Sequence, residues 1–142
     1  MLKIALMSII ELQDEIVEEF NFFDDWMEKY EYIIDLGKEL LPFNEAYKTE
    51  ENRIKGCQSQ LWIHIDNKNG NLHFSADSDA IITKGIAALI LRPIEGKSIK
   101  EIADYNFDFV DEIGLKEHLS MTRSNGLSSM IERISTFAKL NK

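Results

Sequence analysis

The residue with the clearest chemical potential in this chain is its single cysteine. Cys57 is the only cysteine among 142 residues and lies in the stretch 53–62, RIKGCQSQLW. Gly56 precedes it, and the polar Gln58 and Ser59 follow it, before an alternation of apolar and polar residues begins. A cysteine used only for packing would lie inside an apolar run, because free cysteine behaves as a small hydrophobe. The position therefore predicts a bend that leaves the thiol unshielded and available as a nucleophile.

A nucleophilic thiol needs help to ionise, and nearby cations can supply it. Lys55 and Arg53 are local candidates, and Arg123 could reach the thiol from the start of the last predicted helix. A cysteine hydrolase would also need a histidine in space, and His118 is the best placed of the three in the chain. A one-cysteine peroxidase would need a thioredoxin-like βαβ framework, which the predicted order of elements does not provide.

Other chemistries have weaker support in the sequence. The cysteine and the three histidines lack the paired short spacing of zinc sites, so we predict no metal site. His64 and His73 fall on the solvent side of a predicted hairpin. No Walker loop, G-x-G-x-x-G motif or G-x-S-x-G elbow occurs. Gly85 and Gly126 are isolated glycines within helical patterns, where close packing is the expected role.

Composition favours an ordinary soluble domain, with 44% hydrophobic and 29% charged residues. The net charge is −9, and residues 1–52 carry 14 Asp/Glu against four Lys/Arg. Such an acidic region disfavours nucleic acid and could steer a basic partner, although the solvated face of two helices is the favoured explanation. We expect no disulfide, signal peptide or membrane-spanning helix, and therefore a cytoplasmic protein.

The periodicity predicts an α+β fold, with a small antiparallel sheet flanked by N-terminal and C-terminal helices. Ser8 and Glu11 form a capping box, Asp25 caps a second helix, and one of Asp77–Asp79 is expected to cap the helix after the sheet. Residues 1–7 are expected to be a flexible extension of a single domain, 8–142, with Met7 an alternative start. The predicted helices span about 8–20, 26–40, 80–92, 98–103, 107–113 and 123 or 125–140, and the strands span about 60–66 and 72–76, joined by the Asn-Gly turn at 67–71.

Four stretches resemble the SufE family of sulfur-acceptor proteins, which includes CsdE. The most specific is the Gly-Cys-Gln-Ser block around Cys57, and the resemblance covers about Ser8 to Ala138. Departures from the family pattern are conservative, with Ile54 and Leu61 where valine is common. The stretches are 54–62 around the cysteine, 26–37 in the second helix, 77–85 after the sheet and 119–127 at the entry to the last helix.

This resemblance implies a covalent sulfur carrier for iron–sulfur cluster assembly, with the fold shared by the NifU and IscU scaffolds. Cys57 would accept sulfur as a transient persulfide from a SufS-like or CsdA-like cysteine desulfurase, stimulate that enzyme, and pass the sulfur to a scaffold. Pyridoxal phosphate would belong to the desulfurase, and this chain would carry no cofactor and would not act as a stand-alone enzyme. Gly56, Gln58 and Ser59 would shape the loop, and Arg123 matches an arginine that the family places near it.

Two alternatives differ in their use of the thiol. The chain could be a scaffold-like regulatory module that binds a desulfurase without carrying sulfur, or a hydrolase that pairs Cys57 with His118. The hydrolase lacks an evident third group to orient the histidine. For a carrier, a resting position against Trp62 or the last helix would protect a persulfide, whereas an exposed position would ease transfer. The residues alone do not choose between these two positions.

Overall fold

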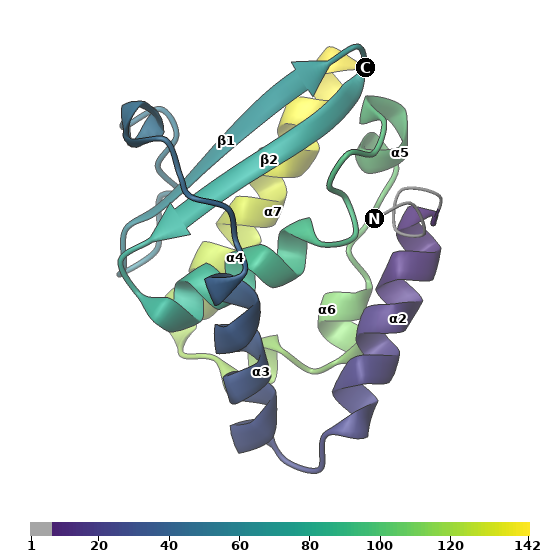
Figure 1. The fold of residues 1–142 in the computed structure, drawn as a ribbon, viewed down its shortest axis with the longest axis vertical. Helices are drawn as coiled ribbons and strands as arrows, with labels where there is room; N and C mark the ends of the chain where they lie inside the picture. Colours follow the sequence, from purple (N-terminus) through teal and green to yellow (C-terminus); the bar gives the residue numbers. More distant parts are fainter. Residues whose placement is uncertain (1–6) are drawn as a thin grey trace.

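The computed structural model describes residues 7–142, which fold as helices around one β-hairpin (Figure 1). The predicted α+β class is confirmed. The expected extension, residues 1–7, lies outside the described residues except for Met7, whose carbonyl accepts a hydrogen bond from Lys97 Nζ. In chain order the elements are α2 (Ile9–Phe22), α3 (Trp26–Lys38), η1 (Glu45–Tyr47), β1 (Leu61–Lys68), β2 (Asn71–Ser78), α4 (Ile81–Leu91), α5 (Ile99–Ala103), α6 (Phe109–Glu112), η2 (Lys116–His118) and α7 (Met121–Asn141).

The hairpin has the alternation and the turn expected from its sequence. Asn69 and Gly70 both take positive φ values, 56° and 88°, as a two-residue hairpin turn requires. Strands β1 and β2 pair antiparallel from Leu61 opposite Ser78 to Lys68 opposite Asn71. One face buries its apolar side chains toward the helices, and α7 crosses behind the hairpin (Figure 1). The buried strand residues are Leu61, Ile63, Leu72 and Ala76.

Helices α3 and α4 cross at two glycines. A Cβ atom on Gly85 would lie 2.2 Å from the carbonyl oxygen of Ile33, and one on Gly37 would lie 2.7 Å from the backbone nitrogen of Gly85. The predicted close packing at Gly85 is therefore confirmed. Gly37 lies inside the last turn of α3. At these contacts the backbones of α3 and α4 pack directly against each other, because neither glycine has a side chain to separate them.

Helix ends follow the capping signals in most places. Ser8 and Glu11 form the expected capping box, and Asp25 accepts a hydrogen bond from the N–H of Glu28. The last helix begins earlier than predicted, at Met121, because Ser120 accepts from the N–H of Arg123 and caps it. Helix α7 therefore includes most of the stretch 119–127, which was expected at the entry to this helix.

Candidate functional site

The cysteine lies in a loop, residues 55–60, that is closed at its base by backbone hydrogen bonds. The N–H of Ile54 donates to the carbonyl of Leu61 at 2.8 Å, and the N–H of Ile63 donates to the carbonyl of Asn52 at 2.9 Å. The segment before the loop thus pairs with β1 like a short additional strand. Ile54 is 2% exposed and anchors this base in the core. The loop therefore ends where the alternating apolar and polar residues of β1 begin.

The thiol at the tip of this loop is partly sheltered. Gly56 has φ of 87°, a conformation that glycine adopts without strain, and Cys57 follows it half-buried. A Cβ atom on Gly126 of α7 would lie 2.9 Å from Cys57 Sγ, so the sulfur rests directly against that helix. The expectation of an unshielded thiol is met only in part, because α7 covers one side of a residue that is half-buried. The alternative of a thiol tucked against the last helix describes the geometry.

Three residues on one face of α7 support the cysteine segment. Gly126, Ser129 and Arg133 follow one another at spacings of three and four residues, so they share a face of the helix. Cys57 packs against Gly126. The next contact is between Gly56 and Ser129, because a Cβ atom placed on Gly56 would lie 3.4 Å from Ser129 Oγ. We call Gly126, Ser129 and Arg133 the α7 track.

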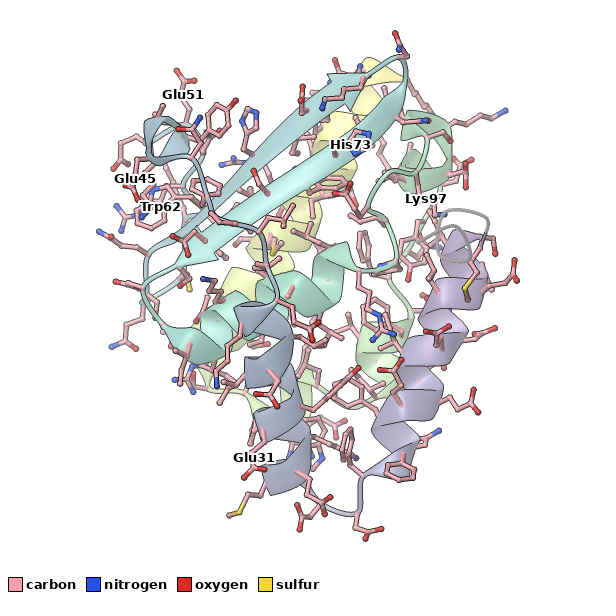
Figure 2. All side chains as sticks on the ribbon, viewed as in Figure 1. Glu31, Glu45, Glu51, Trp62, His73 and Lys97 are labelled. Carbon is pink, nitrogen blue, oxygen red and sulfur yellow. The ribbon has the colours of Figure 1, made fainter. Side chains whose placement is uncertain are left out.

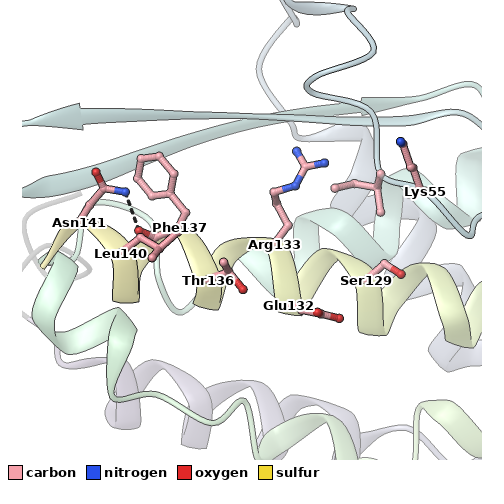
Figure 3. Close-up of a pocket in the computed structure, with 9 residues that line it drawn as sticks. Lys55, Ser129, Glu132, Arg133, Thr136, Phe137, Leu140 and Asn141 are labelled. Atoms are coloured by element: carbon pink, nitrogen blue, oxygen red, sulfur yellow. Dashed lines mark hydrogen bonds between the residues drawn. The ribbon is translucent and has the colours of Figure 1, made fainter.

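Arg133 holds the base of the cysteine loop at the far end of the α7 track. Its guanidinium donates from Nη1 to the carbonyl of Glu51 at 2.9 Å and from Nη2 to the carbonyl of Arg53 at 3.1 Å. Figure 3 shows Arg133 rising from α7 toward this segment, with Lys55 beyond it. Beside these residues lies an open groove of about 450 Å³ whose walls include Lys55 and Phe137. The planar fork of an arginine suits two carbonyls better than a lysine ammonium would.

The last residue of the loop is held by the segment before α4. The N–H of Gln60 donates to Asp79 Oδ1 at 3.0 Å, and Ser78 Oγ donates to the carbonyl of Gln60 at 2.6 Å. The expectation that one of Asp77–Asp79 caps α4 was wrong, because the N-cap is Ala80 and it makes no side-chain hydrogen bond. The polar side chains of Ser78 and Asp79 instead fix the loop.

The segment that leads into the cysteine loop is tied to the outer face of the hairpin by Lys48. Its ammonium lies 3.0 Å from Glu45, 3.3 Å from Asp77 and 5.1 Å from the centre of the Trp62 ring. Figure 2 shows Trp62 and Glu45 together at this place. Burial alone would raise the pKa of Asp77, but the hydrogen bonds from Lys48 and the Ser78 backbone, with the charge of Lys84, lower it overall.

The other predicted site residues lie around the thiol or on α7. Lys55 and Gln58 are exposed in the loop, and Ser59 is half-buried. Arg123 is exposed and lies one turn before Gly126 on α7. No hydrogen bond or ion pair joins its side chain to the loop among residues 7–142, so its role stays a prediction. Sequence reasoning missed the contributions of Asp79 and Arg133, which connect distant parts of the chain.

The histidines are engaged elsewhere. His64 stacks on Tyr47 with 3.6 Å between ring centres, and His73 Nδ1 lies 2.8 Å from Glu95. His118 stacks on Trp26 with 4.0 Å between ring centres. Within residues 7–142 no hydrogen bond joins a histidine to the thiol, and no group of three or more His, Cys, Asp or Glu side chains is arranged to hold a metal ion. A cysteine–histidine hydrolase therefore lacks its base.

The fold and the site define an α+β protein that displays one braced cysteine loop against its last helix. Its sequence matches the family model for SufE, the Fe-S metabolism associated domain, over residues 14–138. The chain belongs to the SufE family, which is associated with iron–sulfur metabolism. In the described part of the chain, residues 7–142, no helix combines the length and the apolar character that a membrane span needs.

Relatives of this chain support the same family. It is 44% identical over 132 residues to an uncharacterized SufE-like protein of Rhizobium etli, covering 89% of each chain. It is 42% identical over 131 residues to an uncharacterized SufE-like protein of Rhizobium meliloti, covering 89% of this chain and 94% of that protein. It is 38% identical over 119 residues to the chloroplastic/mitochondrial SufE-like protein 1 of Arabidopsis thaliana, covering 83% of this chain but only 32% of the plant protein.

A solved structure has the same fold. The solution structure of a hypothetical protein from Thermus thermophilus superposes with a TM-score of 0.75. The superposition covers 92% of this chain and 96% of the other, at 19% sequence identity. At that level of identity the likeness supports the fold alone.

Proposed function

We propose that this protein is a covalent sulfur carrier of iron–sulfur cluster assembly, with Cys57 as its acceptor thiol. The observation that carries the proposal is the geometry of the loop. It is braced at both ends, through Ile54 and Gln60, while no hydrogen bond joins residues 55–59 to another element of the described chain. Such a loop can move its thiol toward a partner without breaking regular structure. Family membership supplies the iron–sulfur context.

The proposed transfer begins with the thiolate of Cys57. It attacks the terminal sulfur of a persulfide on the catalytic cysteine of a desulfurase, Enz–S–SH. A new S–S bond forms to Cys57, the S–S bond within the enzyme persulfide breaks, and the enzyme thiolate leaves with the electron pair. The terminal proton stays with the transferred sulfur as Cys57–S–SH, so sulfur moves without net oxidation or reduction. A thiolate on a recipient scaffold then takes the terminal sulfur in the same way and releases Cys57.

The partners in this proposal are those that the resemblance to the SufE family implies. The donor is a cysteine desulfurase of the SufS-like or CsdA-like kind, which binds its own pyridoxal phosphate and forms the persulfide. The recipient is a protein that builds iron–sulfur clusters. Removing sulfur from the desulfurase frees its cysteine for another cycle, so the carrier stimulates turnover. A carrier thiol must stay reduced between cycles, and the reducing cytoplasm suits it.

The second candidate, a regulatory module that binds a desulfurase without carrying sulfur, makes a different prediction. Desulfurase turnover can be followed as alanine formed from cysteine, with and without this protein. If the protein is a carrier, the wild type stimulates turnover, whereas Cys57→Ser abolishes stimulation while a pull-down still detects binding. Stimulation that persists in Cys57→Ser would contradict the carrier and favour the module.

A further inference from the structure

Gly126 stands out among the glycines within helices because of what surrounds it. The three heavy atoms nearest to a Cβ placed there are all atoms of Cys57: Sγ at 2.9 Å, Cβ at 3.0 Å and Cα at 3.6 Å. Gly85 differs, because its nearest neighbours belong to Ile33 of the crossing helix α3. Gly126 is therefore not explained by a helix crossing. What occupies the space left by its missing side chain is the reactive residue itself.

A glycine at position 126 lowers the stability of helix α7, so its presence there needs a reason. Glycine within a helix is disfavoured relative to alanine, since it loses more conformational freedom on folding. Gly126 lies in the second turn of α7, well inside a helix that runs from Met121 to Asn141. An alanine here would favour the helix but would bring its methyl group far inside the normal contact distance of carbon and sulfur.

The loop, not the helix, would yield to such a methyl group. Next to Gly126, Leu127 is 2% exposed and Met130 is fully buried, so α7 is fixed in the core at this point. No hydrogen bond joins residues 55–59 to another element of the described chain, and Cys57 is only half-buried. A displacement of the thiol outward disturbs few contacts, whereas a shift of α7 would disturb the core.

We propose that Gly126 is a positioning residue that holds the Cys57 thiol in a sheltered resting place and thereby limits its reactivity. The missing side chain provides the space for Sγ on the α7 track, and any larger residue moves the thiol toward solvent. The importance of this shelter for a persulfide rests on the proposed function. The sheltering itself does not, because it concerns the free thiol and can be measured without any partner.

The first test measures how fast iodoacetamide alkylates Cys57 at one fixed pH. We expect Gly126→Ala to react about tenfold faster than the wild type, which corresponds to about 1.4 kcal/mol in favour of the exposed thiol. The matched control is Asn125→Ala, because Asn125 is exposed on the same helix one position earlier, and it should react at the wild-type rate. An unchanged or slower rate in Gly126→Ala would overturn the proposal.

A double-mutant cycle separates positioning from a general loss of stability. Gly126→Ala is introduced into the wild type and into Cys57→Gly, in which no atom of residue 57 closer than 3.6 Å to the new methyl remains. We expect Gly126→Ala to raise the melting temperature more in the Cys57→Gly background, because the clash is then relieved. Equal shifts in the two backgrounds would mean that the cysteine and the glycine do not interact, and would overturn the proposal.

The two proposals fail in different ways. If Cys57 never receives sulfur but the labelling rate responds to Gly126→Ala, the carrier function is wrong and the positioning role holds. If sulfur is received normally but labelling is insensitive to residue 126, the positioning role is wrong and the carrier function holds.

Discussion

The backbone N–H of Gln60 lies 3.0 Å from the carboxylate of Asp79, so the end of the cysteine loop is tied to the residues just before α4. This hydrogen bond joins two segments that the hairpin separates in sequence. Together with the bond from Ser78 to the carbonyl of Gln60, it closes the side of the loop that the α7 track does not reach. The loop is thus held by α7 at Cys57 and by Ser78 and Asp79 at Gln60.

Removal of the Asp79 brace should loosen the loop. Asp79→Ala leaves the N–H of Gln60 without its partner, which costs about 1 kcal/mol for a hydrogen bond of this kind. We expect alkylation of Cys57 to become roughly fivefold faster, because about 1 kcal/mol changes the open fraction by that factor. Asp79→Asn keeps an acceptor oxygen and should react nearly as the wild type. Equal rates for wild type and Asp79→Ala would show that this brace does not hold the thiol.

Arg133 should matter for stability through its geometry as well as its charge. Arg133→Lys keeps the cation but loses the fork that binds the carbonyls of Glu51 and Arg53. We expect a loss of about 1–2 kcal/mol in the free energy of unfolding, measured by urea denaturation. Glu132→Gln, at the exposed neighbouring position, is the control and should have little effect. A lysine variant as stable as the wild type would remove Arg133 from the bracing role.

Asp77 should make part of the stability depend on pH. Its pKa in the folded protein lies below the ordinary value of 3.8, because Lys48, the Ser78 backbone and Lys84 outweigh the effect of burial. The carboxylate therefore stabilises the fold above the unfolded pKa, and this contribution disappears as the pH falls through the folded value. We expect the difference in melting temperature between wild type and Asp77→Asn to be largest near pH 7 and to shrink below pH ~4. A difference that stays constant would contradict the lowered pKa.

The two packed glycines should respond differently to the same substitution. Gly85→Ala would place a methyl group 2.2 Å from a backbone oxygen of α3, and neither helix backbone can move aside easily. We expect a loss of about 3 kcal/mol or more in the free energy of unfolding. Gly126→Ala meets the less constrained cysteine loop instead and should leave the folded state largely intact. Urea denaturation of both variants compares them directly, and equal losses would contradict this assignment of the contacts.

Much of the fold could be predicted from the sequence because its signals are local. The capping box at Ser8, the alternation along Leu61–Lys68 and the Asn69-Gly70 turn depend on neighbouring residues alone. The choice of Cys57 also rests on local sequence, because its neighbours differ from those of a packing cysteine, and its role as acceptor stays a prediction. The close packing at Gly126 could also be predicted, but the identity of its neighbour could not.

The errors concern residues whose partners lie far away in sequence. Asp79 is of a residue type that commonly caps helices. Its carboxylate instead accepts a hydrogen bond from the backbone N–H of Gln60, across the hairpin. The shelter of the thiol depends on α7, the last helix of the chain, which the hairpin, three α-helices and the 3-10 helix η2 separate from the cysteine. Arg133 gave no local sign that it would bind two carbonyls near the loop. Contacts of this kind arise from the tertiary fold and have no pattern in the adjacent sequence.

The most direct test of sulfur transfer is the intact mass of the protein after incubation with a cysteine desulfurase and cysteine, followed by peptide mapping. We predict that one sulfur, ~32 Da, is added to the wild type, maps to Cys57 and is lost on reduction. Cys57→Ser should gain nothing under the same conditions. A wild-type protein that stimulates the desulfurase but never gains this mass, or gains it equally in Cys57→Ser, would contradict the role of Cys57 as a sulfur carrier.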